Sequence, residues 1–171
     1  MPDHYRALAN AARCKKNYVL IAGKYGDRRP RLDKIKQVLD SLNLVGLILD
    51  EYPDIEEQSL AEKMVTYASI CRFVLVDDVE PSGHVKEMDL CQELKFVTAI
   101  LRARGKASTA MHADIADEVS FIRDFSYDSD AEFEGVILEA ARWADETVKK
   151  RAMTLNWRYR DWRGPDRTMG G

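Results

Sequence analysis

The 171-residue chain has little of what marks several large classes of protein. Its three cysteines, Cys14, Cys71 and Cys91, are widely spaced and odd in number, which suits reduced thiols better than a disulfide framework or a zinc site. The three histidines show no metal-ligand spacing. No apolar stretch approaches the length of a membrane span, and the first residues lack the apolar block of a secretory signal. We therefore expect a cytoplasmic protein with no metal site and no membrane contact.

The chain also lacks an excess of positive charge. It has 26 Lys and Arg against 29 Asp and Glu, for a formal net charge of -3. Proteins devoted to the phosphate backbone of nucleic acids carry a basic surplus, so nucleic acid is not the expected partner. The length suits one domain with a full core. We expect a helical arm over residues 1–16, an α/β domain over 17–150 and an aromatic, basic tail over 151–171.

Short apolar runs alternate with segments of helical spacing along the chain. Strands are predicted at 17–22, 45–49, 73–77, 106–112 and 119–125, and helices after each of them. Asp54 is expected to cap the second of these helices; the third is expected to run from Val85 to about Arg104, closed by Gly105, and the last to end near Lys150. Such alternation predicts a doubly wound, mainly parallel sheet of order 2-1-3-4-5 with helices on both faces.

Ligands bind such sheets at the carboxyl ends of the strands, where the strand order reverses between the first and third strands. One loop at this point offers backbone amides, an aromatic ring and cations that suit phosphate; its candidate residues are Gly23, Lys24, Tyr25, Arg28 and Arg29. A solvated surface loop is the alternative. The loop matches neither a P-loop nor a dinucleotide-binding glycine motif. A receiver domain is disfavoured because the first strand ends in Gly23-Lys24 and not in an acidic pair.

The second loop of the predicted crevice joins the buried third strand to its helix. It reads Asp-Asp-Val-Glu-Pro-Ser-Gly-His-Val-Lys-Glu over residues 77–87. Its candidate catalytic residues are Asp77, Asp78, Ser82 and Glu87, and Gly83 and His84 are candidate ligand contacts. The cations of the first loop suit phosphate, whereas acids suit a sugar cation. The two loops together therefore predict a nucleotide site.

The segment from Asp78 to Glu87 resembles the Ser-Gly-Thr-x-x-Glu signature of nucleoside 2-deoxyribosyltransferases and related nucleotide N-glycosidases, with His84 in place of threonine. Residues 17–150 also resemble the bacterial relatives of Toll/interleukin-1 receptor (TIR) domains, which share a flavodoxin-like architecture with those transferases. The resemblance implies that Glu87 is the catalytic residue that cleaves an N-glycosidic bond. The TIR pattern normally has a Trp-Cys pair shortly before that glutamate, and residues 84–86 do not supply it.

Cleaving the bond between a base and ribose develops positive charge on the sugar, which a fixed carboxylate such as Glu87 would stabilise. Nicotinamide leaves NAD without protonation, whereas a neutral base would need a proton from Asp77, Asp78 or His84. The hypothesis is a TIR-like nucleotide N-glycosidase with NAD or a related nucleotide as its substrate and no separate cofactor. The resemblance further implies a bacterial defence or signalling effector.

Simpler interpretations of these residues stay open. Glutamate is favoured in the first turn of any helix by the helix dipole. Asp77 and Asp78 would then merely end a strand, and Ser82 would merely start a helix. The alternative function is a non-catalytic TIR-like module that binds a nucleotide or another protein.

The C-terminal segment interleaves aromatic and basic residues: Trp157, Arg158, Tyr159, Arg160, Trp162, Arg163 and Arg167. Tryptophan and arginine are frequent anchors of protein interfaces. We expect the segment to contact protein, either its own domain or a second copy in a homo-oligomer.

Overall fold

The computed structural model describes residues 3–23, 29–54, 56–78, 85–104 and 120–160. Its strands are β1 (Tyr18–Gly23), β2 (Val45–Ile48), β3 (Phe73–Asp78), β4 (Thr98–Ala103) and β5 (Ile122–Tyr127). Its helices are α1 (Asp3–Asn17), α2 (Arg29–Ser41), the short 3₁₀ helix η1 (Leu49–Glu51), α3 (Leu60–Ile70), α4 (Val85–Glu93) and α6 (Asp130–Arg160). None of the described helices is long and apolar enough to cross a membrane.

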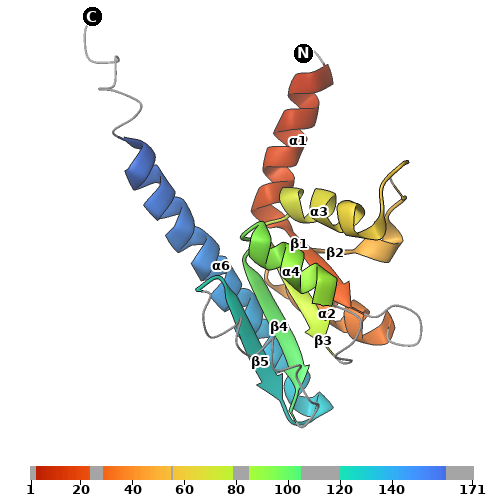
Figure 1. Cartoon of the computed structure of the whole chain (residues 1–171). Coiled ribbons are helices and arrows are strands. Elements are labelled where there is room, and N and C mark those ends of the chain that lie inside the picture. Colours follow the sequence, from red (N-terminus) through yellow and green to blue (C-terminus); the bar gives the residue numbers. More distant parts are fainter. Residues whose placement is uncertain (1–2, 24–28, 55, 79–84, 105–119, 161–171) are drawn as a thin grey trace, which may run out of the picture.

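The five strands form one sheet in the order β2-β1-β3-β4-β5, and all neighbouring pairs are parallel. This is the α/β, flavodoxin-like arrangement that the alternation of strands and helices predicts. Helices α2 and α6 pack on one face, and α3 and α4 cover the other (Figure 1). The central strand β3 is buried over its whole length, because both of its faces lie under helices.

Side chains of each strand alternate between two separate hydrophobic clusters. Residues such as Ile21, Leu75 and Leu101 pack toward α2 and α6, where Leu32 and Ile137 complete the cluster. Their chain neighbours point to the other face, where Leu20, Val74 and Ile100 meet Met64 and Cys91. This alternation explains the continuous apolar runs, since a parallel strand covered on both sides buries every residue.

The helix predicted over Val85 to Arg104 is wrong in its second half. Helix α4 ends at Glu93, and Lys95, with φ of 57°, lets the amide of Phe96 bond the Cys91 carbonyl at 2.9 Å. The chain then enters β4, so the fourth strand is Thr98–Ala103. Leu94, Val97 and Leu101 are three and four residues apart, as on one face of a helix. A strand that is apolar at every position also contains apolar residues at these intervals, so the spacing does not separate the two structures. The predicted strand 106–112 and Gly105 lie outside the described residues.

The prediction that Asp54 caps the second helix is also wrong. The cap of α3 is Ser59, whose hydroxyl accepts from the amide of Glu62 while the Glu62 carboxylate accepts from the amide of Ser59. Such a capping box satisfies two amides that the first helical turn leaves unpaired. Asp54 instead pairs with the buried Lys63 at 2.8 Å.

Replacing Ser59 with alanine should lower the free energy of unfolding by about 1 kcal/mol, because the Glu62 amide loses its acceptor. The control is Ser69→Ala in the last turn of the same helix, where the hydroxyl bonds the Val65 carbonyl within the helix and caps nothing. Urea unfolding followed by circular dichroism measures both. Equal stability of the Ser59 variant and the wild type would contradict the capping role.

The last two elements differ from their predicted bounds. Strand β5 is Ile122–Tyr127, a shift of a few residues along the chain from 119–125. Helix α6 continues past the predicted end near Lys150 to Arg160, so residues 151–160 of the predicted tail are helical. The far half of α6 extends beyond the sheet, on the same side as α1 (Figure 1). Trp162 lies outside the described residues, and the expected protein contact of the tail stays a prediction.

Candidate functional site

The carboxyl edge of the sheet contains the point where the strand order reverses. Strand β1 lies between β2 and β3, so the chain leaves β2, crosses back over β1 and continues in β3. Gly23, the last residue of β1, is the register partner of Asp77 in β3. A Cβ atom at Gly23 would lie 2.7 Å from the Leu32 side chain and 3.4 Å from the Asp77 Cβ. Glycine therefore lets β1 end tightly against α2 and beside the carboxylate.

Asp77 and Asp78 are chain neighbours that point to opposite faces of the sheet. Asp77 lies on the face of α2 and α6, where Arg31 of α2 forms two hydrogen bonds with it, 2.9 Å from Nε to Oδ2 and 3.0 Å from Nη2 to Oδ1. The Asp77 side chain is 2% exposed and that of Arg31 is 20% exposed. Such a two-point contact fixes the orientation of both groups.

Aromatic rings surround the Arg31 guanidinium. It lies 4.0 Å from the centre of the Phe133 ring and bonds the Tyr127 hydroxyl at 2.5 Å. Burial opposes the charge of Arg31, but the hydrogen bonds and charge of Asp77 outweigh burial and raise the arginine pKa. Burial is also the main cause that raises the pKa of Tyr127, against the lowering influence of Arg31. The arginine is thus a permanent cation that ties β3 and β5 to α2.

Asp78 has a different partner on the opposite face. Arg102 of β4, its register neighbour, lies 3.2 Å from Asp78 Oδ2 and contacts Asp124 Oδ2 of β5 at 2.6 Å. The side chains of Asp78 and Arg102 are 6% and 9% exposed. One guanidinium therefore links the ends of three neighbouring strands beneath the candidate site.

These contacts change the roles open to the two acids. The charge of each carboxylate is already paired with a guanidinium, so neither offers its full charge to a sugar cation. Both pairs hold the end of β3 in a fixed register with the elements around it. Asp77 and Asp78 therefore fit a positioning role at this edge better than the catalytic role that the sequence suggests.

The predicted phosphate-binding loop is described only at its ends. Arg29 is the first residue of α2, where its Nε bonds Asp33 at 2.9 Å and its Nη2 bonds Glu51. The hydrogen bond to Asp33 is the largest cause that raises the pKa of Arg29. Arg29 thus has two acidic partners within the domain. Lys24, Tyr25 and Arg28 lie outside the described residues.

Glu87 is the third residue of α4, the helix that follows β3. This agrees with a glutamate in the first helical turn beyond the strand end. Ser82, Gly83 and His84, which join Asp78 to this helix, lie outside the described residues. The structure thus brings Gly23 and Asp77 together and assigns Glu87 to the next helix along the chain.

Sequence reasoning missed Arg31, Arg102 and Tyr127. Arg102 had a usable signal, because it directly follows the apolar run Ala99-Ile100-Leu101, and a cation at the end of a buried strand needs a partner. Arg31 had none beyond the cluster of cations around Pro30. Within the described residues no group of three or more His, Cys, Asp or Glu side chains is placed to hold a metal ion.

Cys71 is buried at the opposite edge of the sheet, and burial raises the pKa of its thiol to about 12. At neutral pH it is therefore a protonated, unreactive core residue. This agrees with the expectation of a reduced thiol.

The chain matches no protein-family model, and no curated protein shows significant sequence similarity to it.

Proposed function

We propose that the chain is a TIR-like nucleotide N-glycosidase that cleaves the base–ribose bond of NAD or a related nucleotide at the carboxyl edge of β1 and β3. The observation that carries the proposal is the reversal of strand order there, which sets Gly23 beside Asp77. Helix α4, which begins at Val85 soon after β3, carries Glu87 in its first turn. In open parallel sheets this is the usual place for a small ligand.

In this proposal Glu87 is the catalytic carboxylate, and the paired acids are its support. Arg31 holds Asp77 and Arg102 holds Asp78, so the strand end from which the loop to α4 departs is fixed on both faces. A fixed origin for that loop favours catalysis, because a carboxylate stabilises a transition state only if it is held in place before the reaction. The further candidate ligand contacts are Lys24, Tyr25, Arg28, Gly83 and His84, which lie outside the described residues.

A second candidate is the non-catalytic nucleotide- or protein-binding module. Two observations favour it: both acids at the end of β3 are paired, and Arg29 is engaged by Asp33 and Glu51. Because these charged side chains already have partners of opposite charge, they can hold the shape of the edge without acting on a ligand. The two candidates share a fold and differ in whether a base is released.

Purified protein incubated with NAD, and separately with common nucleotides, should release free base that chromatography detects. The assay is repeated at high protein concentration, because TIR-like activity would depend on assembly if the chain is an oligomer. Isothermal titration calorimetry on the same samples measures nucleotide binding. Base release supports the glycosidase. Binding without release supports the nucleotide-binding module, and the absence of both contradicts a nucleotide site.

A further inference from the structure

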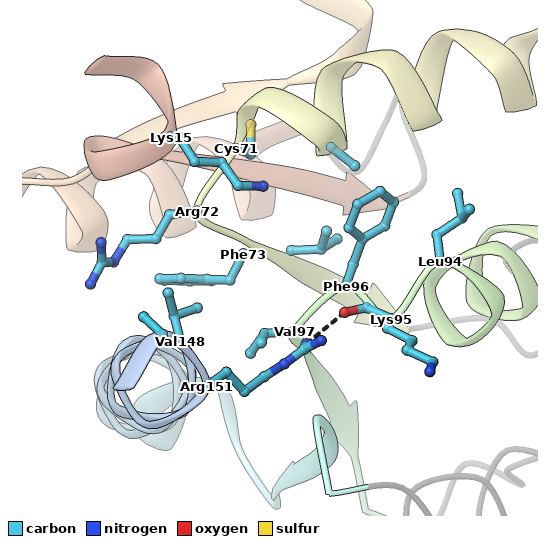
Figure 2. A pocket seen from close by; sticks show the side chains of 13 residues that line it. Lys15, Cys71, Arg72, Phe73, Leu94, Lys95, Phe96, Val97, Val148 and Arg151 are labelled. Carbon is cyan, nitrogen blue, oxygen red and sulfur yellow. Dashed lines mark hydrogen bonds between the residues drawn. The ribbon is translucent and has the colours of Figure 1, made fainter. Parts of the chain in front are cut away.

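A pocket lies at the amino edge of the sheet, opposite the candidate nucleotide site. Its volume is about 330 Å³. Figure 2 shows it between α1 and α6, above the start of β3 and the turn that precedes β4. Its walls come from segments far apart in the chain, from Lys15 to Ala152. None of these residues takes part in the contacts of the carboxyl edge.

The interior of this amino-edge pocket is apolar. Phe73 and Val97 form its base where β3 and β4 begin, and Phe96 and Val148 stand on either side (Figure 2). Apolar pockets that bind small molecules usually have volumes from roughly 300 to 1,000 Å³. The amino-edge pocket lies at the small end of that range, which suits a compact apolar body better than a whole nucleotide.

The charged residues that line the pocket are all cations: Lys15, Arg72, Lys95 and Arg151. Arg72 is neutralised by Asp145, whose oxygen its Nε bonds at 2.5 Å. Lys15, Lys95 and Arg151 form no ion pair with any residue in the described ranges. Lys15 and Arg151 thus bring two cations to the rim of an apolar cavity that has no carboxylate in its lining, which produces a positive potential at the opening (Figure 2).

Lys15 and Arg151 lie on opposite sides of the opening. The Lys15 ammonium projects from α1 over the pocket and donates to the Ser69 carbonyl at 3.0 Å, whereas Arg151 reaches from α6 to the Lys95 carbonyl at 2.6 Å (Figure 2). Each group keeps further N–H donors beyond these bonds. Burial is the main cause that lowers the pKa of Lys15, and the charge of Arg151 lowers it further. An anion between the two would relieve this repulsion.

We propose that the amino-edge pocket binds a small organic anion, a carboxylate with a compact apolar body. The body fills the space between Phe73, Phe96 and Val148, and the carboxylate lies at the opening between Lys15 and Arg151. The cations provide the charge that the carboxylate needs, and the apolar walls favour the body. Both halves of the ligand are thus specified by the pocket.

Isothermal titration calorimetry with octanoate tests the proposal on the full chain. Octanol and octylammonium have the same apolar chain as octanoate but no negative charge. Comparing their affinities with that of octanoate separates the contribution of the charge to binding from that of the apolar chain. Octanoate should bind at least about tenfold more tightly than octanol, since a charge-assisted hydrogen bond contributes about this much. Octylammonium should not bind. Equal affinity for octanoate and octanol, or no binding of octanoate, would overturn the proposal.

Two variants locate the binding site. Lys15→Met should weaken octanoate binding about tenfold, whereas its control Lys16→Met removes an exposed charge from the next residue, outside the pocket lining, and should leave binding unchanged. Ala152→Trp adds bulk to the pocket wall from the exposed side of α6 and should abolish binding. Thermal unfolding confirms that each variant folds. Equal binding by the Lys15 and Lys16 variants, or full binding by the Ala152 variant, would refute this location.

Discussion

Replacing Glu87 with glutamine is expected to reduce base release by about a hundredfold or more while nucleotide binding stays close to that of the wild type. Glutamine keeps the size of the side chain and removes its charge. A unit charge about 4 Å from the developing sugar cation contributes roughly 4 kcal/mol at an effective dielectric constant near 20. This corresponds to roughly three powers of ten in rate. Because the full positive charge exists only in the transition state, turnover falls and affinity does not.

The matched control for Glu87→Gln is Glu93→Gln. Glu93 is the last residue of the same helix α4 and is exposed, so the identical change removes a charge six residues away. Base release measured under single-turnover conditions and binding measured by calorimetry are compared for both variants. If the two variants and the wild type release base at the same rate, Glu87 is not the catalytic residue. If none releases base but all bind nucleotide, the binding module is correct.

Replacing Arg102 with methionine should destabilise the domain by about 3–5 kcal/mol, because it leaves the buried Asp78 carboxylate without its partner. Asp124, which contacts the same guanidinium at 2.6 Å, also loses this contact. Methionine retains most of the length and packing of the arginine stem, so the loss reports charge more than volume. Urea unfolding measures the change in the free energy of unfolding.

Arg104→Met is the control for this prediction. Arg104 follows the same strand by one residue and pairs with Asp128 at 2.8 Å, but its side chain is 67% exposed. An exposed pair typically contributes about 1 kcal/mol or less, so the control should be nearly as stable as the wild type. Adding Asp78→Asn to Arg102→Met should restore part of the lost stability. Equal small effects of the two arginine variants would show that Asp78 does not depend on Arg102.

The sequence was sufficient for the fold class because its strongest signals are local. The run from Phe73 to Val76 is apolar at every position, and a strand with this pattern must be covered on both faces. Repeated alternation of such runs with helical segments then leaves few topologies, of which the order 2-1-3-4-5 is one. The acids at the end of β3 and the glutamate of the next helix were likewise visible as neighbours in the chain.

The spacing of apolar residues gave the wrong element where a helix and a strand fit it equally well. The spacing of Leu94, Val97 and Leu101 satisfies a helix, yet the helix ends at Glu93 and Thr98–Ala103 is a strand. Lys95 has the positive φ that glycine usually supplies, so the end of α4 carried no glycine signal. At α3 the expected cap was Asp54, whereas the reciprocal bonds between Ser59 and Glu62 make Ser59 the cap.

By itself the sequence determined that the protein is an α/β domain with a buried central strand that ends in two acids. Only the tertiary structure decided what those acids do. Arg31 is 46 residues from Asp77 along the chain and Arg102 is 24 residues from Asp78, and strand register and helix packing bring them together. The amino-edge pocket likewise joins Lys15 to Arg151. Local patterns fix burial and periodicity, whereas the partner of a charge depends on which distant segments the fold makes adjacent.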